Sequence, residues 1–201
     1  MSSIKGVMLL PLAAESYRRN VAHHTFLAKV NAPTKVPDPR LELTNFVEDW
    51  VRQELRSHFI ETSYRVLRWE QLDARNHYVV RFRELDGVFD VGRGVKLLLE
   101  VKASASKSSL KSGLQQLRSA VQTAVHAYPN TIGLLIIAGL GEWFDIFGNA
   151  PIEPLEDYFN DMDVDLLEWP PRLPAGKTSG ICVSLIPGSA LREWLPKESL
   201  G

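Results

Sequence analysis

The spacing of apolar and polar residues divides the chain into helical and extended segments. Apolar side chains recur every three or four residues at 39–59 and again at 110–128, which predicts two amphipathic helices; a looser pattern of this kind covers 13–30. Asp38-Pro39 is typical of a helix start. The aspartate side chain can accept hydrogen bonds from the first N–H groups of the helix, and the N–H that proline lacks would have no partner within the helix at this position. Strands are expected at residues 4–12, 64–69, 78–91, 95–103, 132–138 and 181–186.

The order of these elements predicts the fold class. Strands lead into the helix at 110–128, and the continuous apolar run at 132–138 then indicates a strand covered on both faces. Such a crossover predicts an α/β sandwich with a mixed central sheet. We expect a single domain over 1–201, with its core at about 38–138 plus the strand at 181–186. An acidic, aromatic- and Pro-rich insertion at about 142–178 carries too many aromatics for disorder to be expected.

Charge is nearly balanced overall but is distributed unevenly. The formal net charge is −1, so any field that attracts nucleic acid has to be local. Residues 93–118 hold six basic side chains and one acidic one, whereas 142–168 hold nine acidic and no basic ones. A single cysteine, Cys182, excludes an intrachain disulfide and favours a reducing compartment. No run reaches the roughly 18 apolar residues of a membrane helix, so we expect a cytoplasmic protein without a membrane partner.

Charged side chains gather where two of the expected strands meet. Asp86 lies in the first strand, Glu100-Val101-Lys102 ends the second, and a turn at Gly92 and Gly94 joins them. Because alternate side chains of a strand share a face, Glu100 and Lys102 point the same way, and a hairpin brings Asp86 near them. Two carboxylates and the Val101 carbonyl suit Mg²⁺, and Lys102 could orient a water. The simpler alternative is an ion pair between Glu100 and Lys102 beside a turn aspartate.

The helix at 39–59 carries an acidic residue in an unexpected position. Glu54 follows Trp50 by four residues and Val51 by three, which puts it near the middle of the apolar stripe. A buried carboxylate without a partner is costly, so Glu54 should meet a cation or metal or tilt out at the edge. Glu48 lies at the border of the stripe, where solvent reaches it easily.

Together these segments resemble a known family. Glu-Leu-Asp-Gly-Val around Asp86, then Leu-Leu-Leu-Glu-Val-Lys ending at Lys102, is similar to the motif of the PD-(D/E)XK nuclease superfamily, with its restriction-endonuclease-like α/β/α core. The resemblance covers about residues 38–138. It implies that Asp86 and Glu100 bind Mg²⁺, or Mn²⁺ in its place, and that Lys102 is the catalytic lysine. It also implies that Glu54 is the acidic residue that many members place beside the metals, and that Gln116, or its neighbour Gln115, is the glutamine that some members carry at the site on the helix after the motif.

Two functions follow as expectations. The first is a metal-dependent nuclease that hydrolyses phosphodiester bonds of DNA, with phosphate contacts from Lys107, Lys111 and Arg118, side chains that could equally form a solvated helix face. The second is a nuclease-fold subunit of a larger complex, with weak or no activity alone, that binds a protein partner through 142–168. That acidic segment could also fold over the basic residues of 93–118 as a lid. A homodimer is compatible with the sequence as well.

Overall fold

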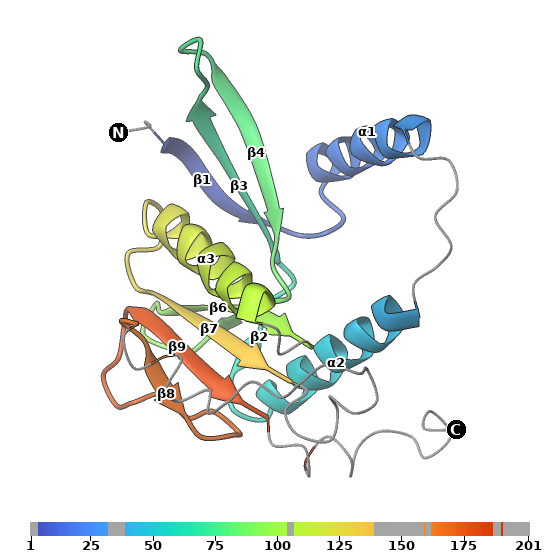
Figure 1. Ribbon diagram of the computed structural model, residues 1–201. Helices are drawn as coiled ribbons and strands as arrows, with labels where there is room; N and C mark the ends of the chain where they lie inside the picture. The colour runs from blue at the N-terminus through green and yellow to red at the C-terminus, as the bar shows by residue number, and fades with distance from the viewer. Residues whose placement is uncertain are drawn as a thin grey trace.

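A computed structural model describes residues 4–31, 39–103, 107–138, 159, 162–186 and 190 of the chain. The described helices are α1 (Glu15–Asn31), α2 (Pro39–Leu55) and α3 (Lys107–Ala124). The described strands are β1 (Ile4–Leu10), β2 (Ile60–Glu61), β3 (Val66–Leu72), β4 (Tyr78–Glu84), β5 (Gly87–Asp90), β6 (Lys96–Lys102), β7 (Thr131–Ile137), β8 (Asp165–Leu167) and β9 (Gly180–Leu185). Figure 1 shows their arrangement.

A six-stranded mixed sheet forms the centre of the fold, in the order β2-β5-β6-β7-β9-β8. Strands β6, β7, β9 and β8 run parallel, while β2 and β5 pair antiparallel at one edge. Helix α3 connects β6 to the parallel β7, and every residue of β7 is buried. The mixed α/β class and the buried strand at 132–138 are therefore confirmed.

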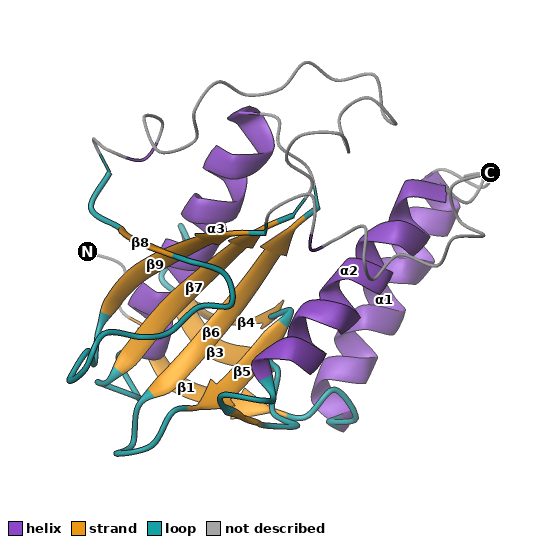
Figure 2. Cartoon of the chain, turned by 90° about the horizontal axis from the view of Figure 1, so that it is seen from below, coloured by secondary structure: helices purple, strands orange, loops and turns teal. Residues whose placement is uncertain are grey.

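Helices cover both faces of the central sheet (Figure 2). On one face the apolar stripe of α2, including Trp50 and Leu55, packs with Leu97 and Leu99 of β6. On the other face Leu98 packs with the leucines of α3. The alternation along β6 thus gives the sheet two separate apolar layers, as expected for a strand buried on both sides.

A second, antiparallel sheet of order β1-β3-β4 lies beside α3. The prediction of one continuous strand at 78–91 is wrong: β4 belongs to this outer sheet and β5 to the central one. The chain crosses between the sheets at Leu85 and Asp86. The carbonyl of Asp86 accepts hydrogen bonds from Arg52 and Arg65 at 2.9 and 3.1 Å, in place of a bond to a neighbouring strand.

The acidic segment lies mostly outside the described residues. Its described part adds β8 to the edge of the sheet and packs Trp169 on Trp50, with ring centroids 5.5 Å apart. Asp165 opens β8 and pairs with Lys177. The aromatic, Pro-rich part after residue 164 therefore closes one face of the core. None of the described helices is long and apolar enough to cross a membrane.

Candidate functional site

Asp86 lies across from Glu100 at the open end of the β5–β6 hairpin, where β5 begins and β6 ends. The register pairs Gly87 with Leu99, so the residues one step further along, Asp86 and Glu100, face each other. The backbone N–H of Val101 donates a hydrogen bond of 2.6 Å to Asp86 Oδ2. Since the N–H and C=O of one extended residue point to the same edge, the Val101 carbonyl also opens toward Asp86.

Lys102 shares the face of Glu100, and its Nζ lies 2.5 Å from Glu100 Oε1. Its aliphatic stem is held against helix α3. A Cβ added at Gly113 would lie 2.9 Å from both Cγ and Cε of Lys102, closer than real side chains approach. Gly113 therefore leaves the space in which the lysine stem lies, and α3 positions the ammonium group beside the two carboxylates.

Helix α2 contributes Glu48 to this site. Glu48 is partly buried, and its carboxyl interacts electrostatically with both Lys102 and Glu100. Glu54 lies six residues further along, which turns its side chain about 120° around the helix axis from Glu48. The structure thus brings Glu48 to the cluster from the border of the apolar stripe, whereas Glu54 is partly exposed on another face of α2.

Two carboxyl groups of this cluster, those of Asp86 and Glu48, have raised pKa values. Burial, followed by the negative charges of Glu100 and Glu48, raises the pKa of Asp86 from 3.8 to about 7. The hydrogen bond from Val101 and the charge of Lys102 act in the opposite direction but are outweighed. Burial likewise raises the pKa of Glu48. The acidic groups of Asp86, Glu100 and Glu48 outnumber the ammonium of Lys102, and this leaves an excess of negative charge that a proton or a cation would balance.

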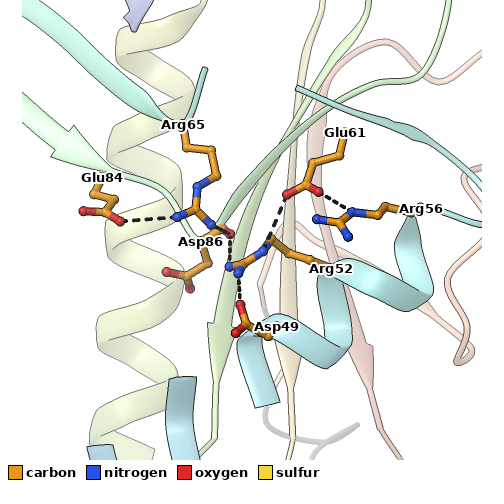
Figure 3. Close-up of polar contacts among 7 residues, drawn as sticks. All are labelled: Asp49, Arg52, Arg56, Glu61, Arg65, Glu84 and Asp86. Atoms are coloured by element: carbon orange, nitrogen blue, oxygen red, sulfur yellow. Dashed lines mark hydrogen bonds and ion pairs between the residues drawn. The ribbon is translucent and has the colours of Figure 1, made fainter. Parts of the chain in front are cut away.

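Arginines hold the backbone at the sheet crossing (Figure 3). Arg52 and Arg65 converge on the carbonyl of Asp86, and Arg52 also pairs with Asp49. Arg65 Nη2 lies 3.6 Å from a carboxylate oxygen of Glu84 on β4. These contacts tie α2, the residue that precedes β3, and β4 to the residue on which the site depends. The sequence analysis missed both arginines, although Arg52 follows Glu48 by one helical turn.

Glu61 extends this arginine network along α2. Its carboxylate pairs with Arg56 and lies 3.5 Å from Arg52 Nε. Burial lowers the pKa of Arg52, and the positive charge of the nearby Arg65 lowers it further. The network is therefore an ordered support beside the carboxylates, with its own acidic partners.

The other predicted residues lie along α3 or at the far end of the hairpin. Gln116 and Gln115 are exposed, and the Gln116 carbonyl accepts a hydrogen bond from Arg83. Lys111 is exposed and Arg118 partly exposed on the same helix, whereas the side chain of Lys107 lies outside the described residues. Asp90, at the other end of β5, pairs with Lys96 at 2.9 Å and so lies away from the cluster.

The donor set can be compared with what a divalent cation needs. No group of three or more His, Cys, Asp or Glu side chains in the described part of the chain is arranged to hold a metal ion. Mg²⁺, however, commonly takes only one or two protein carboxylates and keeps several waters. Asp86 uses Oδ2 and Glu100 uses Oε1 in the bonds given above, so each carboxylate has a second oxygen that could serve as a ligand. The residues present therefore fit a two-carboxylate Mg²⁺ site.

Comparisons with known proteins give no family for this chain. No protein-family model, no curated protein and no solved structure matches it.

Proposed function

We propose that the protein is a metal-dependent nuclease that hydrolyses phosphodiester bonds, with DNA as substrate. The observation that carries this proposal is the convergence of Asp86, Glu100 and Lys102 where β5 begins and β6 ends, within the electrostatic influence of Glu48. The mixed sheet, with one helix before the motif and a crossover helix after it, supports the resemblance to the PD-(D/E)XK superfamily.

Each group has a role that its position supports. Asp86, Glu100 and the Val101 carbonyl would hold Mg²⁺ or Mn²⁺, which supplies Lewis-acid polarisation of a phosphoryl oxygen when bound. Lys102 Nζ, beside Glu100, would orient the attacking water and stabilise negative charge that develops on the phosphate. Glu48 adds negative charge that strengthens the attraction for a cation. Lys111 and Arg118 would contact phosphates along α3.

Cleavage of DNA by variants of the purified chain tests this proposal. Lys102→Ala should abolish Mg²⁺-dependent cleavage while the far-ultraviolet circular dichroism spectrum is unchanged. Lys96→Ala is the matched control, because Lys96 lies on the same strand and pairs with an aspartate of β5, away from Glu100. Cleavage that survives both Lys102→Ala and Glu100→Ala would refute the assignment.

A second candidate is a nuclease-fold subunit that acts mainly by binding a partner. Helix α1 extends away from the central sheet in Figure 1. It carries exposed apolar side chains: Phe26 is 66% exposed, and Val21 and Leu27 are 42% and 41% exposed. If this is the main role, the isolated chain should be inactive with metal, and Phe26→Ser should abolish co-purification of a defined second protein. Mg²⁺-dependent cleavage by the isolated chain would favour the first candidate.

A further inference from the structure

A pocket of about 580 Å³ lies between the β5–β6 turn and the loop that precedes β9. It is far from the proposed nuclease site, since it adjoins the start of β6 while Glu100 and Lys102 lie at the end. The seven residues of β6 rise about 3.3 Å each, so roughly 20 Å of strand separates the two. The volume is in the range of small-molecule sites.

The ionisable side chains that line this pocket are all of basic type. They are His58, Arg93, Arg172 and Lys177. Lys177 pairs with Asp165, so its charge is partly balanced from outside the lining. Arg93 and Arg172 are exposed, and neither forms an ion pair with another residue in the described part of the chain. Asp90, the acid close to the turn in sequence, is already bonded to Lys96 and to the backbone N–H of Gly92. Two guanidinium groups are thus available to an anion.

The remaining wall of the pocket is largely apolar. Phe59, Val91 and Leu173 pack against the core cluster beneath the sheet, and Val95 and Pro171 are buried. Phe59 contacts the ring of the buried Phe89 edge-on, at 6.4 Å between ring centroids. A flat apolar group could therefore lie against a surface that is already formed, which reduces the entropy lost on binding.

The backbone of the turn adds a third observation. Arg93 has φ of +53°, between two glycines that also have positive φ. A bulky residue rarely takes this left-handed conformation, which costs roughly 1 kcal/mol or more outside glycine. The turn thus holds a long cationic side chain at the pocket rim in a position where glycine would be easier to accommodate.

From the pocket, its two free guanidinium groups and its apolar wall, we propose that this site binds a small organic phosphate with a flat aromatic body, the chemical class of nucleoside phosphates. The guanidinium groups of Arg93 and Arg172 bind the phosphate oxygens, since planar guanidinium matches phosphate geometry. The aromatic body lies against Phe59 and its apolar neighbours. This inference does not depend on the proposed nuclease activity, because it uses none of the residues assigned to cleavage.

Isothermal titration with ADP, adenosine and inorganic phosphate tests the proposal, at low salt and with EDTA present so that no metal bridges the carboxylate site. ADP should bind at least about tenfold more tightly than either adenosine or inorganic phosphate, because only ADP uses both parts of the pocket. Adenosine or phosphate binding as tightly as ADP would overturn the proposal, as would no binding of ADP at millimolar concentration.

Two variants locate the binding. Arg93→Gly removes the guanidinium and places glycine where φ is already positive, so the turn should fold normally, and ADP affinity should fall about tenfold or more. Arg172→Gln should have the same effect. Arg75→Gln, an exposed arginine in the β3–β4 turn, is the matched control for net charge and should leave affinity unchanged. ADP binding that is equally strong in Arg93→Gly and Arg172→Gln would overturn the assignment to this pocket.

Discussion

Replacing Asp86 by asparagine should stabilise the metal-free protein at alkaline pH while removing the proposed nuclease activity. The pKa of Asp86 is raised from 3.8 to about 7, so between these values the folded state holds a proton that the unfolded state has released. Stability therefore falls as pH rises from about 4 to about 7. Asparagine avoids this loss, and its side-chain oxygen can still accept the hydrogen bond from Val101.

The size of the effect follows from the shift. About three pKa units correspond to roughly 4 kcal/mol at most, at about 1.4 kcal/mol per unit. Asp86 is only partly buried, so solvent screening reduces this, and we expect about 1–2 kcal/mol at pH 8.

Urea denaturation in EDTA at pH 4 and pH 8 measures this difference. Asp86→Asn should unfold at a higher urea concentration than the parent protein at pH 8, and at nearly the same concentration at pH 4. Mg²⁺ at pH 8 should stabilise the parent protein but not the variant. Asp90→Asn is the matched control: hydrogen bonds from Lys96 and the Gly92 N–H lower the pKa of Asp90, so its loss should not stabilise at pH 8. If Asp86→Asn is no more stable than the parent at pH 8, the account of the carboxylate cluster is wrong.

Three further predictions concern positioning and packing. Gly113→Ala should lower kcat for DNA cleavage with little change in KM, because the added methyl group displaces the stem of Lys102; an unchanged kcat would show that the lysine adapts freely. Glu48→Gln should weaken Mg²⁺ binding, measured by titration calorimetry, more than Glu54→Gln does. The reason is that the charge of Glu48, and not that of Glu54, acts on Asp86. A larger effect of Glu54→Gln would show that Glu54 belongs to the site. Trp50→Ala should lower the free energy of unfolding by about 3–5 kcal/mol in urea denaturation, since Trp50 is 4% exposed and packs on Trp169; a loss below about 1 kcal/mol would contradict the packing described.

Apolar periodicity was enough to locate the core elements. The run at 132–138 is uniformly apolar because both faces of β7 are covered, and the stripe of α2 is apolar because one face meets the sheet. The break between β4 and β5 was not predictable in this way, because residues 78–91 keep a strand-like pattern across it. The crossing depends on Arg52 and Arg65, which reach the Asp86 carbonyl from elements that are distant in sequence.

The site was predictable in part for a similar reason. Strand alternation and one short turn are local, and they sufficed to bring Asp86, Glu100 and Lys102 together. Which acid of α2 faces them depends on how the helix is rotated against the sheet, and this rotation is set by tertiary packing. Glu48, at the border of the apolar stripe, acts on the polar site at the end of β6. The apolar residues around Glu54 did not predict which side of α2 would be turned toward that site.

A crystal grown or soaked with Mn²⁺, examined by anomalous diffraction, tests the central claim most directly. The account predicts a single strong anomalous peak within coordination distance of Asp86, Glu100 and the Val101 carbonyl, and its loss in Asp86→Asn. Absence of manganese there at a saturating concentration, with Lys102 still paired to Glu100, would contradict the account and leave the cluster as an ion pair beside a buried aspartate.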